Sequence, residues 1–125
     1  MRMGNTVGFE VVNRESGSPG YWIYKFPGLR MHLGEDSFNV ERIRPLEVDQ
    51  SRTDRWFWFR PEIDDRERTE AVRFSNQVMQ EDIEICTRVQ ENLQAGHYDR
   101  GVLSPEREPG TVFFQSWVRQ ALENG

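Results

Sequence analysis

A charged, helix-forming stretch occupies residues 65–95 and reads DRERTEAVRFSNQVMQEDIEICTRVQENLQA. Its apolar residues recur at the three- and four-residue spacing of one helix face. Gly96 follows as a candidate C-cap residue, and the pair Ser75-Asn76 is a candidate break in the pattern. The spacing predicts a long helix over residues 65–95 with one apolar face.

Strand patterns precede this stretch without a helix between them, which favours antiparallel pairing. The aromatic run Trp56-Phe57-Trp58-Phe59 predicts a strand that is covered on both faces. Pro45 is expected to end the strand before it, and Thr111 is expected to cap a short last helix. We therefore expect an α+β domain with an antiparallel sheet packed against the long helix. The predicted strands are residues 6–12, 21–26, 29–33, 38–44 and 56–59.

Length and composition indicate a single globular domain over residues 1–125. Hydrophobic residues make up 36% of the chain and charged residues 30%, an ordinary globular balance. The formal charge of -5 argues against a nucleic-acid or membrane partner. No apolar run has the length of a membrane span and no secretory signal is visible, so we expect a cytoplasmic protein.

The chain has few residues that bind metals well. One cysteine, Cys86, excludes an internal disulfide and any multi-cysteine zinc or iron–sulfur site within this chain. The two histidines, His32 and His97, leave little material for a self-contained metal centre. We expect His32 to be an outward-facing strand residue and His97 to have a local role after the helix end.

Asp82 falls at the centre of the apolar face of the long helix. On a helical wheel the charged residues nearest in sequence lie on the far side, namely Glu81, Glu84, Arg88 and Glu91. A lone carboxylate among apolar residues is costly unless it is paired or bound to a cation. One interpretation is an ion pair with an arginine of the sheet. The other is a metal ligand or a catalytic acid, and Cys86 on the same face is then a small core residue. The apolar residues within roughly 60° of Asp82 are Val78, Met79, Ile85, Cys86, Val89 and Leu93. The candidate arginines are Arg42, Arg44, Arg55 and Arg60.

Four segments resemble one known family. The segment QEDIEICTRVQENL, residues 80–93, resembles the late catalytic-domain helix of Rieske non-haem iron oxygenases, the large subunits of ring-hydroxylating dioxygenases and related demethylases. The segments YDRGVLSPEREPG, residues 98–110, and FFQSW, residues 113–117, resemble the tail of that domain. Phe26-Pro27-Gly28-Leu29 resembles the family's Phe-Pro-Asn-Leu strand turn, with Gly in place of Asn.

The resemblance implies a helix-grip fold and a mononuclear Fe(II) held by two histidines and one carboxylate. The residue that matches the carboxylate is Asp82, so the resemblance favours the ligand interpretation over the ion pair. The family's reaction is oxygen activation at iron, followed by hydroxylation of an aromatic ring or oxidative N-demethylation. Met79, Cys86, Trp56 and Trp58 are expected to line the substrate side.

The family's other metal ligands have no counterpart in this chain. A Rieske cluster needs two cysteines and two histidines, so we expect no iron–sulfur cluster here. His32 and His97 do not match the His-x-x-x-x-His spacing of the iron-binding histidines. We therefore expect the C-terminal half of a catalytic domain. It would be completed by a companion chain that carries the Rieske cluster and both histidines, or by a homo-oligomer such as the family's trimer. The alternative is a non-catalytic helix-grip domain that binds an apolar ligand or completes a partner subunit.

Overall fold

The computed structural model describes residues 2–12, 17–98, 100–104 and 106–124. Asp99 and Pro105, two residues of the family-like tail, lie outside the described residues. The chain forms two compact units. The first comprises Met1–Trp58 with Val102–Gly125, and the second comprises Phe59–Gly101.

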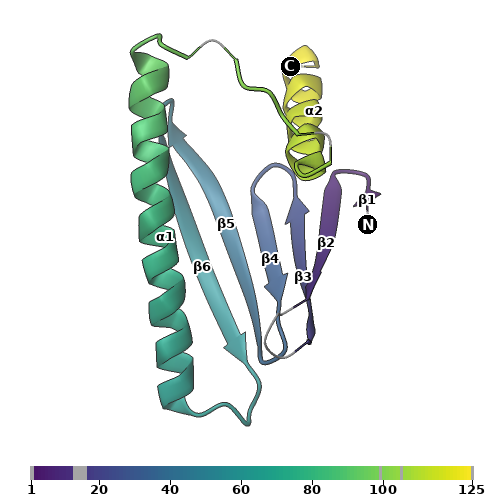
Figure 1. Cartoon of the computed structure of the whole chain (residues 1–125), viewed down its shortest axis with the longest axis vertical. Helices are drawn as coiled ribbons and strands as arrows, with labels where there is room; N and C mark the ends of the chain where they lie inside the picture. The colour runs from purple at the N-terminus through teal and green to yellow at the C-terminus, as the bar shows by residue number, and fades with distance from the viewer. Residues whose placement is uncertain (1, 13–16, 99, 105, 125) are drawn as a thin grey trace. The chain divides into compact units, whose positions relative to one another are not determined.

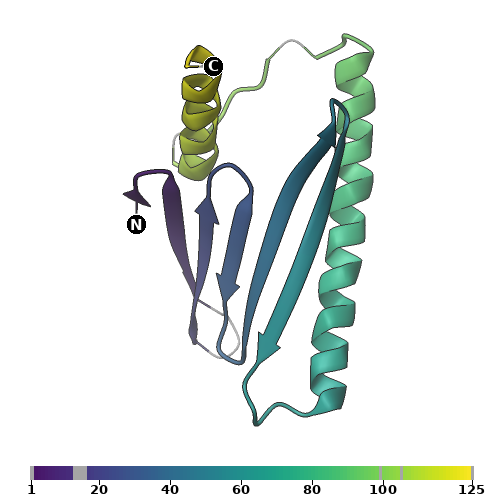
Figure 2. The ribbon, with the colours of Figure 1, turned by 180° about the vertical axis from the view of Figure 1, so that it is seen from behind.

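The first unit is built on an antiparallel sheet whose strands lie side by side in chain order (Figures 1 and 2). This order confirms the predicted antiparallel pairing, because each strand from β1 to β5 pairs with the next in the opposite direction. The last residue of β6 belongs to the second unit. Within the described residues the strands are β1 (Arg2–Met3), β2 (Thr6–Val12), β3 (Pro19–Lys25), β4 (Leu29–Leu33), β5 (Ser37–Glu47) and β6 (Gln50–Phe59).

Strand register divides the side chains between two faces of the sheet. Residues directly opposite each other on neighbouring strands lie on the same face. One face therefore carries two mixed rows, Phe9–Trp22–His32–Asn39 and Val7–Tyr24–Arg30–Glu41. The other face carries the apolar rows Ile23–Met31–Val40 and Tyr21–Leu33–Phe38.

Helix α2 (Pro109–Glu123) packs on the first of these faces, beside the turn between β3 and β4 (Figures 1 and 2). The ring of Trp117 lies 6.5 Å from that of Tyr24 and 6.0 Å from that of Phe26. Among the described residues, the buried apolar side chains are those of Val7 and Trp117. The core of this unit is therefore small and centred on the contact between α2 and the sheet.

The prediction that Thr111 caps α2 is wrong, because the N-cap residue is Glu108 and the helix begins at Pro109. Proline fits the first turn of a helix, where its missing N–H would have no helical partner and its φ is already helical. Glu108 is the N-cap residue, and its side chain makes no capping hydrogen bond.

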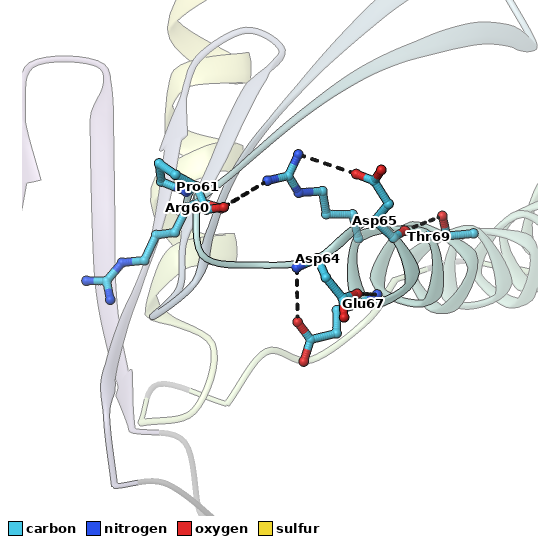
Figure 3. Close-up of polar contacts among 7 residues, drawn as sticks. Arg60, Pro61, Asp64, Asp65, Glu67 and Thr69 are labelled. Atoms are coloured by element: carbon cyan, nitrogen blue, oxygen red, sulfur yellow. Dashed lines mark hydrogen bonds and ion pairs between the residues drawn. The ribbon is translucent and has the colours of Figure 1, made fainter.

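The second unit contains the long helix α1 (Asp65–Gln94), which confirms the predicted helix. A capping box starts it: the Glu67 N–H donates to Asp64 Oδ1 at 2.8 Å, and the Asp64 N–H donates to Glu67 Oε2 at 3.2 Å (Figure 3). Gly96 follows the C-cap with φ +72°, a conformation that favours glycine. The helix continues through Ser75-Asn76 without a break.

The α+β fold class, with an antiparallel sheet, a long helix and a short C-terminal helix, is thus confirmed. The packing of the long helix on the sheet and the single-domain organisation stay predictions. No helix in the described part of the chain is both long and apolar enough to cross a membrane.

Candidate functional site

Asp82 lies in the middle of α1, where its side chain is exposed. The sequence predicted that Asp82 lies on a face packed against the sheet. Within its own unit α1 contains no buried residue, because no other helix or long strand of the described residues in that unit covers it. Packing of the Asp82 face on the sheet stays a prediction. The helix pattern shows which residues share a face with Asp82, but it does not provide the surface that covers that face.

Within the unit that contains α1, no described arginine forms an ion pair with Asp82. An ion pair with an arginine of the sheet stays a prediction. One of the candidate partners, Arg44, instead donates to Asp54 Oδ2 at 2.5 Å. Asp54 also accepts from Arg52 Nε at 2.8 Å. Arg44 therefore already shares a carboxylate within its own unit.

The other predicted site residues occupy two elements. Met79 and Cys86 lie three residues before and four residues after Asp82, so they share its side of α1. Met79 is half-buried and Cys86 is exposed, so the prediction of Cys86 as a core residue is wrong. That these residues and the tryptophans of β6 line one substrate surface stays a prediction.

Trp56 and Trp58 are 45% and 51% exposed, so the prediction that this strand is covered on both faces is wrong. The ring of Trp58 stacks on Phe38 with centroids 5.4 Å apart, which covers one of its sides. β6 is the last strand in the order of the sheet, and an edge strand has a strand neighbour on one side only.

A complete iron site does not fit this chain alone. Among the described residues there is no group of three or more His, Cys, Asp or Glu side chains that could hold a metal ion. That Asp82 donates one carboxylate to an iron site stays a prediction. Of the two histidines, His97 is exposed and His32 is half-buried with its ring stacked on Trp22.

His32 is half-buried rather than outward-facing, which corrects the prediction from sequence. Its ring stacks on Trp22 with centroids 4.2 Å apart, and Asn39 Nδ2 lies 3.4 Å from its Nδ1. Burial lowers the pKa of His32 below 6.5, and the nearby charge of Glu41 offsets part of that shift. The β3–β4 pairing causes this, because it brings the indole of Trp22 directly opposite the histidine.

A charged pair, Arg30 and Glu41, lies on the same face of the sheet as His32. Arg30 Nε donates to Glu41 Oε2 at 2.6 Å, and Arg30 Nη2 forms an ion pair with the same oxygen. Glu41 is only 7% exposed, and the guanidinium of Arg30 also lies over the ring of Trp22. Sequence analysis missed this pair, since only the register of β4 and β5 shows that the two residues are directly opposite.

This face of the sheet also borders a cavity of about 510 Å³ beneath α2. Its size lies within the range of small-ligand pockets, about 300–1,000 Å³. Arg30 is the one charged residue among its described lining residues, and the rest of the lining is mainly apolar or aromatic. The aromatic rings in the lining are those of Phe9, Trp22, Tyr24 and Phe114.

Tyr24, one of the lining residues of this cavity, carries a hydrogen-bonded phenol. Its hydroxyl donates to the carbonyl oxygen of Pro27 at 2.6 Å. Burial raises the pKa of Tyr24 above 10.0, so the phenol stays protonated near neutral pH and keeps this hydrogen bond.

The α+β architecture, with a carboxylate on its late helix, agrees with the comparison to known families. The chain matches the family model of the ring hydroxylating alpha subunit, catalytic domain, over residues 2–124. Because the match covers nearly the whole chain, the chain belongs to this family of non-haem iron oxygenases. No curated protein and no solved structure matches it.

Proposed function

We propose that this chain is the C-terminal portion of a Rieske-type oxygenase catalytic domain and that Asp82 supplies the carboxylate ligand of its Fe(II). The observation that carries the proposal is the family match over residues 2–124, which includes the helix that bears Asp82. The exposed side chain of Asp82, without an ion pair among the described residues of its own unit, supports it. Iron held in this way leaves positions open for oxygen and supplies the oxygen activation.

The remaining ligands are proposed to come from outside residues 1–125. One cysteine and two histidines are too few for both a Rieske cluster and the iron site. We therefore propose a cytoplasmic companion chain that carries the cluster and two iron-binding histidines. A homo-oligomer, such as a trimer, is the alternative assembly. The single-domain organisation of residues 1–125 belongs to the same proposal.

The proposed substrate is an aromatic compound, which is either hydroxylated on its ring or oxidatively demethylated. We assign Met79, Cys86, Trp56 and Trp58 to the substrate side. Met79 and Cys86 share the helix face of Asp82, and the two tryptophans expose broad apolar surface. In this assignment the four side chains bind and orient the ring and exclude water from it.

The proposal is tested by producing the chain alone and together with a companion that carries the Cys-x-His and His-x-x-x-x-His motifs. Iron content and product formation from an aromatic substrate are measured in both samples. We expect weak iron binding by the chain alone, and one iron per mononuclear site with product formation in the assembly. Tight stoichiometric iron binding by the isolated chain would contradict the division of ligands between two chains.

A second candidate function is supported by the cavity beneath α2. Its size and aromatic lining suit a small apolar molecule, so the chain alone would be a non-catalytic ligand-binding domain or would complete a partner subunit. Binding of naphthalene to the isolated chain, followed by the fluorescence of its tryptophans, distinguishes this function. Loss of binding in Phe9→Ala, with retention in the matched variant Phe74→Ala on α1, would support it.

A further inference from the structure

A second cavity, of about 470 Å³, lies where the β3–β4 turn meets β5. Three cationic side chains and no carboxylate contribute to its lining. This is unusual in a chain with 21 acidic residues, 16 Lys and Arg residues and a formal charge of -5. The described lining residues are Lys25, Phe26, Pro27, Gly28, Leu29, Arg42, Ile43, Arg44 and Pro45.

Strand register brings the three cations to one face of the sheet. Lys25 pairs across the strands with Leu29, and Leu29 pairs with Arg42. Lys25 and Arg42 therefore flank Leu29 at a Cα separation of about 10 Å, twice the distance between neighbouring strands. Arg44 follows Arg42 by two residues on the same strand, so it lies on the same face.

These charges are incompletely neutralised within the chain. Neither Lys25 nor Arg42 has a carboxylate partner among the described residues. Arg44 shares the carboxylate of Asp54 with Arg52, so one negative charge serves two positive ones. Desolvation raises the pKa of Asp54, but hydrogen bonds from Arg44 and Arg52 outweigh it and lower the pKa below 3.8. An anion in the groove would relieve the repulsion among the cations.

Hydrogen bonds hold the backbone that frames the groove. The Phe26 N–H donates to the Asn5 carbonyl oxygen at 2.9 Å, and Asn5 Nδ2 donates to the Phe26 carbonyl oxygen at 3.1 Å. On the other side, the Ile43 N–H donates to the Gly28 carbonyl oxygen at 2.7 Å. A Cβ atom at Gly28 would overlap the carbonyl oxygen of Ile43, so the turn approaches β5 as closely as glycine permits. Such preorganisation lowers the entropic cost of binding a ligand.

We propose that this groove binds a small amphiphilic anion. Its carboxylate or phosphate head group would lie among Lys25, Arg42 and Arg44, because ionised oxygens form strong hydrogen bonds with these donors. Its apolar body would lie against Leu29, which the register places between Lys25 and Arg42 on the same face of the sheet. The cations give selectivity for negative charge, and the side chain of Leu29 gives selectivity for a ligand with a chain or ring.

The test is a titration of the isotope-labelled full chain, followed by amide chemical shifts. Octanoate and octyl phosphate carry both parts of the proposed ligand, acetate and inorganic phosphate carry only the head group, and octanol carries only the tail. We expect one or both octyl anions to shift the amides of Gly28, Leu29 and Ile43. We expect them to bind at least about tenfold more tightly than either part alone, and the tighter of the two identifies the head group. Equal binding of octanol, or shifts confined to the cavity beneath α2, would overturn the proposal.

Matched charge-neutralising variants locate the head group. Lys25→Gln and Arg42→Gln should each weaken binding of the octyl anion about tenfold, the loss typical for one hydrogen bond to a charged group. Arg73→Gln removes the same charge from an exposed position on α1 and should leave binding unchanged. Affinity of the wild-type chain should also fall as sodium chloride is raised. Unchanged binding in both groove variants, or an equal loss in Arg73→Gln, would contradict the assignment.

Discussion

Replacement of Trp117 by alanine should remove the main contact between α2 and the sheet. Trp117 is 6% exposed, and its ring packs against those of Tyr24 and Phe26. A buried tryptophan removes about 150–250 Å² from water. At about 25 cal/mol per Å², this area corresponds to about 4–6 kcal/mol. That figure is an upper bound, because unfolded chains already bury some of their apolar surface.

We therefore expect Trp117→Ala to lower the free energy of unfolding by about 3–5 kcal/mol, the range measured for such truncations. Because whole domains are stable by about 5–15 kcal/mol, the variant should be close to unfolding at room temperature. The assay is urea denaturation followed by circular dichroism at 222 nm, which does not depend on the fluorescence of the deleted indole.

Leu122→Ala is the matched control on the same helix, since its side chain is 77% exposed. An exposed truncation of this kind should cost less than about 0.5 kcal/mol. A loss below about 1 kcal/mol for Trp117→Ala, or equal losses for both variants, would refute the assignment of this contact as the core of the first unit.

Three other predictions are tested by the same urea assay. Because the pKa of His32 is lowered in the folded chain, the unfolded chain binds a proton at His32 more readily. The stability that neutral His32 contributes is therefore present above pH 6.5 and falls as the pH drops below that value. His32→Gln should flatten this pH dependence. Arg30→Met leaves the nearly buried Glu41 without its partner, so it should lower the free energy of unfolding by about 1–3 kcal/mol. This figure is discounted because Arg30 is partly exposed. Adding Glu41→Leu should recover most of the lost stability. Asp64→Ala removes the capping hydrogen bond of α1 and should cost about 1 kcal/mol, whereas Asp64→Asn should cost less. An unchanged pH profile in His32→Gln, no recovery in the double variant, or equal losses at Asp64 would contradict the respective predictions.

Helix α1 and two of the strands were predictable because local chemistry marks their ends. The helical spacing and Gly96 locate α1 within one residue of its observed C-terminal end. The predicted strands 6–12 and 29–33 match β2 and β4, and turn-forming residues flank both segments in the sequence. These signals depend on neighbouring residues alone, so no knowledge of tertiary structure is needed to use them.

The C-terminal end of β5 was harder to predict, because the effect of proline on a strand depends on its position in the sheet. Pro45 was expected to end this strand, yet β5 continues to Glu47. The pairing of β5 with β4 extends only to Arg42, so the missing N–H of Pro45 removes no hydrogen bond on that side. Likewise β6 starts at Gln50, within residues 47–53, whose polar composition is typical of a turn.

Of the candidate site, only the arrangement of residues along α1 was predictable from the sequence. Helical geometry shows that Asp82 shares a face with Met79 and Cys86, and the observed helix agrees. Its exposure was not predictable, since a pattern along one helix does not determine what covers that helix. The Arg30–Glu41 pair joins residues 11 positions apart, and only the strand register brings them together.

The most direct test of the proposed function is the iron content of the assembled oxygenase with Asp82→Asn in this chain. Asparagine keeps the shape of the side chain and removes the charge that a cation requires. We expect Asp82→Asn to assemble with the companion chain but to lose its mononuclear iron and its turnover. Glu84→Gln, which neutralises another exposed carboxylate of α1, should retain both. Full iron content and activity in Asp82→Asn would contradict the account.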